Sequence, residues 1–448
     1  MLFYYTNFVQ IMILLQSFAS VRTEDIREPP YQVTHIGKDG GWLWFNNESI
    51  VIDRNALYVG SEDSKGNSKV SMFTTDNYWH KKMATDYQLS DWPEKHQKYP
   101  YHNYPSLLML NNGNLLAVYH HSSKDMFCRI AEVSDGEGAT ASLKWGKEDL
   151  IQLNSGMNYS NLIQLTNEKN TIYNFFSIYK QSPSVMTSQD GGRSWSQDSV
   201  FMRQGKNGTS PYSRFVDNGT DRIDMVYTNG HPRSNPDNNI YHVYYYKGKL
   251  YNSDGTIISS LSQAKRKPIA AESGTKIYSG SHQQPGWVWD IEYDDHGVPV
   301  VAFISSADGS EGKDLRYRYA KWNSEMKHWE ERQIAYAGTH IYVPENHFAG
   351  GISIDPENVN VVFISSNVNP ETGGQTASKR YQIYRGITED NGGSWKWEQL
   401  TFDTNKDNLR PVVPRHHHYD ICVIWQAMND NASSRGFDSD IMGIFKKG

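Results

Sequence analysis

Short apolar runs rich in β-branched and aromatic residues recur along the whole chain, and Gly, Asn, Asp or Ser bounds each of them. Helical periodicity is almost absent. Short strands repeated in this way predict an all-β repeat architecture, because each unit buries its apolar face against its neighbours. The chain has no Pro-rich or Ser-rich linker and no low-complexity tract that would divide it. Examples of the runs are 172–176, 222–227, 241–246, 298–304, 359–364 and 421–425.

One motif occurs twice. Residues Ser188 to Trp195 and Thr388 to Trp395 both fit S/T-x-D-x-G-x-S/T-W. The Asp can accept hydrogen bonds from turn amides, the Gly permits a tight turn, and the Trp can pack on the sheet. The motif resembles the Asp-box of sialidase-like propellers, a structural turn. A propeller blade takes about 40–50 residues, so the chain has room for seven or eight blades, and we expect seven.

Composition narrows the classes of function. Apolar residues make up 38% of the 448 residues, and aromatic residues make up 13%, with 29 Tyr and 13 Trp. Aromatic side chains fill cores, and exposed ones offer flat faces on which sugar rings stack. The formal net charge of -6 argues against a general nucleic-acid surface. A polyanionic ligand would instead need a local basic cleft.

The first 20 residues resemble a secretory signal peptide. An apolar run at 8–15, too short to span a bilayer, precedes the small-residue pattern Phe18-Ala19-Ser20, although no Lys or Arg precedes the run. We therefore expect a signal peptide at 1–20, a propeller catalytic domain at 21–448 and secretion to an extracellular or periplasmic space. No later segment reads as a membrane helix. The two cysteines, Cys128 and Cys422, could pair or remain two buried thiols.

A series of segments, in this order, resembles the BNR-repeat family that contains the seven-bladed propeller polysaccharide lyases, notably the ulvan lyases. The resemblance covers essentially the whole mature chain. The segments are Gly40-Gly41-Trp42-Leu43-Trp44-Phe45, His102-Asn103-Tyr104-Pro105, the first Asp-box, Arg222-Ile223 with Thr228-Asn229-Gly230-His231-Pro232, Trp287-Val288-Trp289-Asp290-Ile291, Gly350-Gly351-Ile352-Ser353-Ile354-Asp355-Pro356 and Asn408-Leu409-Arg410-Pro411-Val412-Val413-Pro414.

The resemblance implies a site of two histidines, a tyrosine and an arginine. His102 matches the first histidine and Tyr159 matches the tyrosine. The second histidine falls at the end of the next strand, where we choose His121 and keep His120 as the alternative. Where the family has its arginine this chain has Ser177, with Lys180 close behind. The identity of the group that neutralises a substrate carboxylate is therefore left open.

These residue types suit β-elimination from a uronic-acid polymer. A base removes the proton at C5 of the uronate, an acid protonates the leaving oxygen at C4, and a cationic or hydrogen-bonding group faces the carboxylate. We assign His102 and Tyr159 as the base and acid pair, in an order left open. His121, and Lys180 with it, would help to neutralise the carboxylate. The chemistry requires no cofactor. We expect the protein to be a monomer whose partner is an acidic polysaccharide.

Several other residues are candidates for the site or for a metal ion. Tyr212 and Arg214 either line the cleft, with Arg214 pairing to a carboxylate or sulfate, or form a solvent-exposed strand pair. His231 is expected to tie a turn. Adjacent histidines on a strand point to opposite faces, so at most two of the three at 416–418 could share a structural calcium or zinc ion. Asp53, Asp290 and Asp355 are candidates for turn or calcium contacts.

Three functions remain open at this point. The first is an endo-acting lyase for a uronate-containing, sulfated polysaccharide such as ulvan. The second is an exo-acting lyase or hydrolase on rhamnosyl-glucuronic acid termini; a hydrolase usually needs two carboxylates at the bond, and no such pair accompanies His102. The third is a carbohydrate-binding propeller without activity, for which Ser177 is the main argument. A sialidase is less favoured, since its arginine triad cannot be placed.

Overall fold

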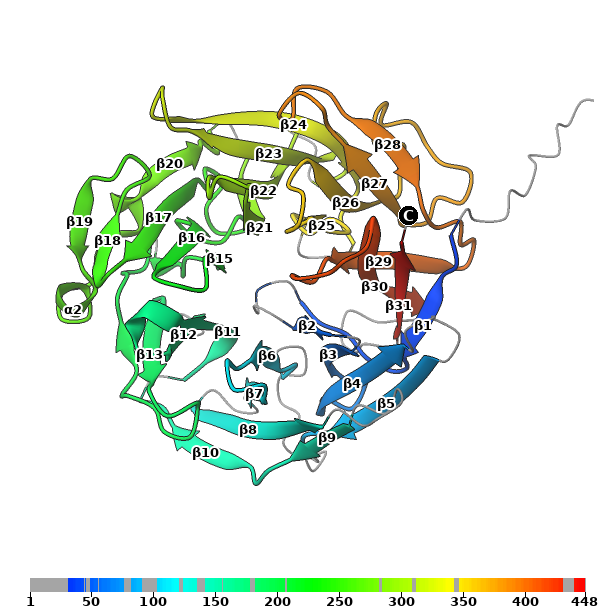
Figure 1. Ribbon diagram of the computed structural model, residues 1–448. Helices are drawn as coiled ribbons and strands as arrows, with labels where there is room; N and C mark the ends of the chain where they lie inside the picture. The colour runs from blue at the N-terminus through cyan, green and yellow to red at the C-terminus, as the bar shows by residue number, and fades with distance from the viewer. Residues whose placement is uncertain are drawn as a thin grey trace, which may run out of the picture.

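The chain forms a ring of blades around a central axis, a seven-bladed β-propeller (Figure 1). The computed structural model describes residues 31–43, 45, 49–54, 56–75, 82–90, 103–120, 124–134, 142–154, 156–177, 182–205, 208–281, 284–307, 312–341, 346–429 and 439–447. Within these residues the strands make seven antiparallel sheets. The predicted all-β class and the predicted number of blades are both confirmed. The expected signal peptide at 1–20 lies outside the described residues.

Each blade is a meander, and in every blade except the last the first strand in sequence lies nearest the axis (Figure 1). The first three blades are β2 (Ile50–Asp53), β3 (Ala56–Glu62), β4 (Ser68–Thr75) and β5 (Lys82–Gln88); β6 (Ser106–Met109), β7 (Leu115–His120), β8 (Asp125–Ser134), β9 (Ser142–Trp145) and β10 (Asp149–Gln152); and β11 (Asn158–Leu165), β12 (Thr171–Ser177), β13 (Ser184–Ser188) and β14 (Ser199–Val200).

The next three blades include the largest sheet. They are β15 (Ser213–Asp217), β16 (Arg222–Thr228), β17 (Ile240–Tyr246), β18 (Lys249–Tyr251), β19 (Ile257–Ser260) and β20 (Thr275–Tyr278); β21 (Gly286–Tyr293), β22 (Pro299–Ser306), β23 (Leu315–Asn323) and β24 (His328–Gly338); and β25 (Ile352–Ile354), β26 (Val361–Ser366), β27 (Gln382–Ile387) and β28 (Lys396–Gln399). The short helices are η2 (Thr166–Glu168), α2 (Leu261–Ala264) and η4 (Ala271–Ser273). Among the described residues, no helix is long and apolar enough to cross a membrane.

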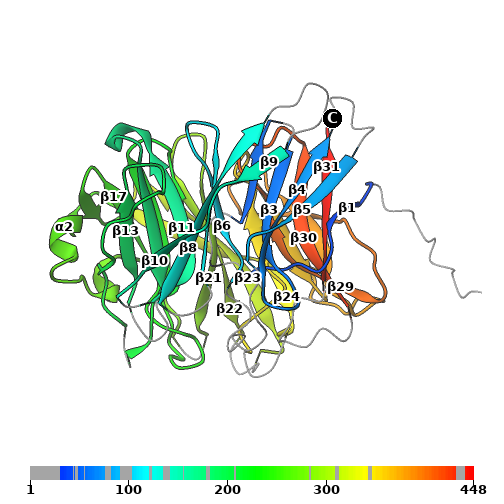
Figure 2. The same ribbon diagram turned by 90° about the horizontal axis from the view of Figure 1, so that it is seen from below.

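The last blade closes the ring with strands from both ends of the described chain. β1 (Thr34–Gly37) pairs antiparallel with β31 (Ser439–Lys446), which continues through β30 (Ile421–Asn429) to the inner strand β29 (Lys406–Val412). The edge-on view shows β1 and β31 next to each other beside the first blade (Figure 2). Closure gives the last blade its fourth strand and covers an edge of β31 that would otherwise be open to pairing with another chain.

The burial of each strand follows from its place in a blade. Both faces of a middle strand pack against neighbouring blades, so β22 and β7 are buried at every residue and read in sequence as continuous apolar runs. The long strand β23 instead alternates between buried and half-buried residues. Cys128 and Cys422 are buried free thiols, and burial raises the pKa of each. The structure thus bears out the two-thiol reading.

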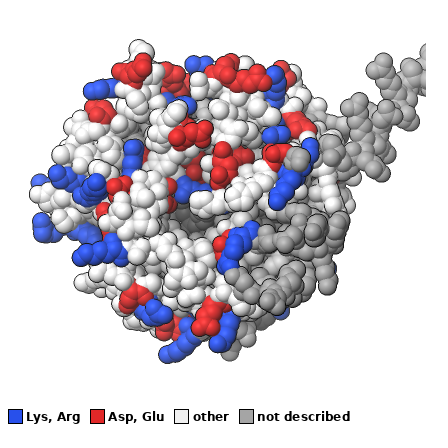
Figure 3. Space-filling view, viewed as in Figure 1, with Lys and Arg blue, Asp and Glu red and all other residues white. Residues whose placement is uncertain are grey.

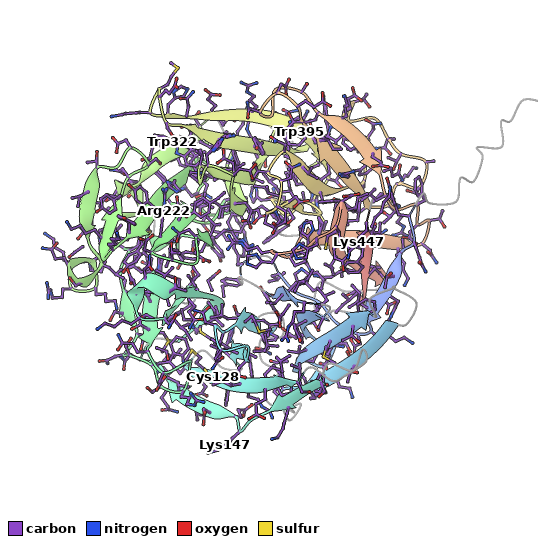
Figure 4. The ribbon with its side chains drawn as sticks, in the orientation of Figure 1. Cys128, Lys147, Arg222, Trp322, Trp395 and Lys447 are labelled. Atoms are coloured by element: carbon purple, nitrogen blue, oxygen red, sulfur yellow. The ribbon has the colours of Figure 1, made fainter. Side chains whose placement is uncertain are left out.

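Both predicted Asp-boxes form the turn that their sequence implies, between the third and fourth strands of a blade. Asp390 accepts hydrogen bonds from the amide and the hydroxyl of Ser394, each at 2.8 Å. Trp395 Nε1 donates to the Gly392 carbonyl at 3.2 Å, and its ring packs edge-on against Tyr319 of β23 in the preceding blade (Figure 4). The equivalent bonds around Asp190 are the same. Each box therefore fixes a hairpin and an interblade contact.

A buried polar network joins the blade that begins with β15 to the blade that begins with β21. Asp224 has no exposed surface and accepts two hydrogen bonds from Arg222, at 2.6 and 2.7 Å. His242 lies 2.9 Å from Asp224 through Nε2 and 2.9 Å from Ser253 through Nδ1. Tyr293, in the next blade, donates to Asp224 at 2.5 Å. Figure 4 shows Arg222 between these blades.

This network should stabilise the fold in a pH-dependent way. Burial alone raises the pKa of Asp224, but the hydrogen bond and charge of His242 and the charge of Arg222 outweigh it, so the pKa lies below its ordinary value. The stabilisation is present above the ordinary Asp pKa and is lost as the pH falls through the lowered one. We expect Asp224→Asn to lower the free energy of unfolding by about 3 kcal/mol, measured in urea at pH 7.

The control is an exposed ion pair. Glu132 meets Lys144 at 3.3 Å on the surface, where both side chains are largely in solvent. Because exposed pairs contribute about 0–1 kcal/mol, Glu132→Gln should change stability by less than about 1 kcal/mol. Equal losses in the two variants would contradict a special role for the buried network.

Candidate functional site

The innermost strands begin at one face of the ring and end at the other. Rings at or just before the starts of β11, β15 and β21 touch one another, which places those starts together. Residues at the ends of β2, β6, β11 and β15 instead line one shared cavity. We call these two sides the start face and the end face. The sequence-predicted residues Tyr159 and Tyr212 belong to the start face.

Six rings gather at the start face, and we call them the aromatic cluster: Phe45, Tyr159, Tyr212, His231, Trp287 and Phe348. Phe45 lies 5.1 Å from Tyr159 and 5.0 Å from Tyr212, between ring centroids. Trp287 lies 4.7 Å from Tyr212 and 4.8 Å from His231. Such tilted contacts between rings stabilise by about 0.5–1.5 kcal/mol each. The cluster is therefore a preformed apolar surface that carries polar edges.

The backbone at Tyr159 is strained. Its φ of 60° is rare for a non-glycine residue, and it lies where the register of β11 against β12 shifts between Asn158 and Asn161. Asn161 holds the bulge, because its Nδ2 donates to the carbonyls of Tyr159 at 2.8 Å and Phe175 at 3.0 Å. A conformation of this kind costs about 1–3 kcal/mol and persists where the surroundings impose it, often at functional sites.

The predicted histidines are only partly described. His102, His121 and Lys180 lie outside the described residues. Asn103 is fixed just before β6, where its amide donates to Glu62 at 2.9 Å and its Nδ2 donates to the Gly66 carbonyl at 3.0 Å. His120 ends β7, pairs with Met126 across the sheet and is only 5% exposed. It is thus a buried blade residue.

Ser177, which stands where the resemblance implies an arginine, ends β12. It is 7% exposed and lies opposite Asn158, next to Tyr159. The position therefore adjoins the aromatic cluster, but it brings a small neutral hydroxyl there. The buried hydroxyl of a serine supplies no positive charge for a substrate carboxylate.

Tyr212 and Arg214 face different surroundings. Tyr212 belongs to the aromatic cluster, and its amide donates to Thr228 at 3.1 Å. Arg214 lies deeper, beside an inner cavity of about 50 Å³, where it meets Asp290 at 3.4 Å. Asp290 also accepts from the Ile354 amide at 2.9 Å. The charge of Arg214 is thus opposed by a buried carboxylate of another blade, and neither residue forms part of a solvent-exposed strand pair.

Two histidines at the start face, His231 in the aromatic cluster and His347 beside it, have different roles. His231 ties a turn, as expected: its Nδ1 accepts the Arg233 amide at 3.2 Å, while its ring touches Tyr212 and Trp287. Burial, followed by the charges of His231 and His340, lowers the pKa of His347 to about 4. His347 is therefore neutral near pH 7 and lies 3.5 Å from Ser306.

The residues considered for a metal ion are engaged within the protein. His417 meets Asp355 at 2.9 Å through Nε2 and accepts the Tyr419 amide at 3.3 Å through Nδ1. Asp53 pairs with Arg54 at 2.8 Å. In the part of the chain that the structure describes, no group of three or more His, Cys, Asp or Glu side chains is arranged to hold a metal ion. The structural metal stays a prediction that these contacts do not support.

Sequence reasoning missed Phe45, His347 and Phe348 as members of the site or its immediate surroundings. Each lies in a connecting loop, and none belongs to a periodic pattern. Phe45 closes the Gly-Gly-Trp-Leu-Trp-Phe segment, which supplied a family likeness but no local signal for a cleft. Contacts between loops of different blades depend on ring closure, which a local pattern does not encode.

Comparison with known proteins agrees with this architecture. A family model described as BNR repeat-containing family member matches residues 56–337. A structure of an ulvan lyase, a polysaccharide lyase bound to GlcA(1-4)Rha3S, aligns with a TM-score of 0.66 at 12% identity over 93% of this chain and 97% of that chain. A second ulvan lyase structure gives a TM-score of 0.66 at 13% identity with the same coverage. No curated protein matches the sequence.

Because the pKa of His347 is lowered, we predict that the free energy of unfolding depends on pH. Between pH 6.5 and about 4 the unfolded chain takes up a proton that folded His347 does not, so stability falls as the pH falls through this window. From pH 7.5 to 5 this loss is on the order of 2 kcal/mol. Replacement His347→Gln should remove that part of the loss, measured by urea unfolding at both pH values.

A histidine on the surface serves as the comparison. His328 is exposed at the start of β24, so His328→Gln should leave the pH dependence of the wild type unchanged. If His347→Gln and His328→Gln gave the same pH dependence, the burial of His347 would not be its cause.

Proposed function

The chain belongs to the BNR repeat-containing family, and we propose that it is a secreted polysaccharide lyase. Its substrate would be an acidic polysaccharide that contains uronate, sulfated as ulvan is. Its reaction would be β-elimination at the start face of the propeller.

The observation that carries this proposal is the aromatic cluster around the strained Tyr159. Tyr159 and Tyr212 are half-buried and present aromatic surface of the kind on which sugars pack, while Trp287 is buried and supports the ring of Tyr212. The bulge fixes the backbone of Tyr159, and Phe45 and Tyr212 pack against its ring; a fixed acid or base needs no reorganisation in the reaction. A fold shared with an ulvan lyase supports the same substrate class.

In this mechanism the reaction is a proton transfer coupled to bond cleavage. One member of the His102 and Tyr159 pair removes the proton from C5. The electron pair forms the C4–C5 double bond, and the bond from C4 to the glycosidic oxygen breaks. The other member gives its proton to that oxygen. Water is not consumed, and the product carries an unsaturated uronate at its new end.

The substrate carboxylate must be neutralised for the C5 proton to leave. Ser177 cannot carry a charge, and Arg214 is held by Asp290. We assign the role to His121 in its protonated form, with Lys180 as a second cation. Both follow strands that end at the start face, β7 and β12. The neutralising group would thus be a histidine and a lysine in place of an arginine.

A second function is favoured by one specific observation. Ser177, in place of an arginine beside the cluster, would suit a propeller that binds an acidic glycan without cleaving it. An exo-acting hydrolase of rhamnosyl-glucuronate termini has less support. It would need two carboxylates at the bond, and the aromatic cluster contains none.

The first test follows the ultraviolet absorbance of the unsaturated uronate during incubation with ulvan and with a rhamnosyl-glucuronate gum. Wild type should raise it, His102→Ala should abolish the rise, and Tyr159→Phe should lower the rate by about 10²-fold or more. The Phe ring keeps the packing with Phe45 and Tyr212, so the Tyr159→Phe variant should unfold like wild type.

The matched control is another tyrosine. Tyr251 lies in β18, stacked on Tyr244 away from the start face, and Tyr251→Phe should keep full activity. Release of reducing sugar without absorbance would indicate a hydrolase. Binding of either glycan without any cleavage would leave the binding propeller as the better account.

A separate prediction distinguishes the two adjacent histidines. Successive residues of a strand point to opposite faces, and His120 is buried in its blade. We expect His121→Ala to lower kcat by about 10²-fold with normal stability. His120→Gln should instead lower the free energy of unfolding by about 1–3 kcal/mol and keep kcat per folded molecule. The reverse pattern would give the catalytic role to His120.

A further inference from the structure

A second cavity opens at the end face of the ring, on the side opposite the aromatic cluster. Its volume is about 440 Å³, and its wall comes from the ends of β2, β6, β11 and β15 and from the loop that follows β29. Ile421 at the end of that loop pairs with Lys446, so the C-terminus lies on the same face. Figure 3 shows this face hollowed near the centre of the ring, with acidic and basic side chains around the hollow.

The charges that line this cavity are paired with one another. Arg54 meets Asp53 at 2.8 Å. Arg415 meets Asp217 at 3.4 Å and reaches Glu292 at 3.0 Å. The two lining carboxylates therefore oppose the two lining guanidinium groups. An anion entering the cavity would approach carboxylates as closely as arginines, so this lining gives a polyanion no advantage.

Neutral hydrogen-bonding groups and an apolar wall complete the lining. His416 and His418 present imidazoles that are exposed to solvent. The amides of Asn111 and Gln164 also line the cavity, where they are held by hydrogen bonds to each other and to Asn170. The apolar wall includes the half-buried Leu108. Donors, acceptors and apolar surface are thus interspersed around one concave space.

We propose that this cavity is a binding site for a neutral sugar unit. Each sugar hydroxyl both donates and accepts a hydrogen bond, which matches amides, imidazoles and arginine–carboxylate pairs set side by side. The C–H face of a sugar ring is apolar and fits the leucine wall. A volume of about 440 Å³ falls within the range of about 300–1,000 Å³ of ligand sites and accommodates one or two sugar rings.

This site is separate from the proposed catalytic site, because the aromatic cluster lies at the starts of the inner strands and this cavity lies at their ends. Its existence does not require lyase activity. In a protein that meets polysaccharides, a neutral-sugar site on the end face would hold a less charged part of the same material while the start face acts on its acidic part. It would raise the effective concentration of substrate near the enzyme.

The test uses saturation-transfer NMR on the full-length protein, with glucose, xylose and rhamnose as neutral probes, glucuronate as the anionic probe and inorganic sulfate as a competitor. Wild type should give signals with at least one neutral sugar and none with glucuronate, and excess sulfate should leave the signals unchanged. His418→Ala and Leu108→Trp should lose those signals, the first by removing a hydrogen-bonding group and the second by filling the cavity. Urea unfolding of both variants checks that they fold.

Two control variants test whether the sugars bind in this cavity. His296 is an exposed histidine in the turn after β21 that does not line the cavity, and His296→Ala should keep the signals. Tyr212→Ala alters the start face and should also keep them. Signals only with glucuronate, signals that sulfate abolishes, no signal with any probe, or signals that survive both cavity variants would each overturn the proposal. At saturating substrate the lyase activity of His418→Ala should equal that of wild type, so the two proposals can fail separately.

Discussion

The pairing of β1 with β31 is the constraint on which the rest of the structure depends. It completes the last blade and closes the seven blades into a ring. The meander of each blade gives the inner strands a common direction, and closure gathers their starts around one mouth and their ends around the other. Residues as distant in sequence as Phe45 and Trp287 then touch. A chemical site in this protein is a product of that closure.

The sequence predicted those parts of the structure that local physics determines. The Asp-boxes depend on hydrogen bonds within seven or eight residues, so their turns could be foreseen from the Asp, Gly and Ser positions alone. The all-β class followed from strand length and the spacing of turn residues. The two Asp-boxes indicated a propeller, and chain length allowed seven or eight blades, of which we expected seven.

What the sequence could not predict are contacts between blades. Nothing near Arg214 indicates that Asp290 will oppose its charge, because the partner comes from the next blade. The lowered pKa of His347 likewise arises from burial and from the charges of His231, on another loop, and His340, on its own loop. Tyr159 could be named as a candidate, but its strained backbone follows from the bulge against β12, which Asn161 holds by reaching the carbonyl of Phe175 in that strand.

The replacement of an arginine by Ser177 has a consequence for how the start face can treat an acidic glycan. An arginine holds its charge at every relevant pH, whereas a histidine in that role must be protonated to neutralise a carboxylate. A lyase that relies on His121 needs it protonated while the base of the pair is not. The two requirements confine activity to the pH range between the two titrations. An arginine at 177 would remove the limit that the protonation of His121 sets on this range. The departure therefore predicts a narrower pH profile than an arginine-based site would give, and the width of that profile reports which group faces the carboxylate.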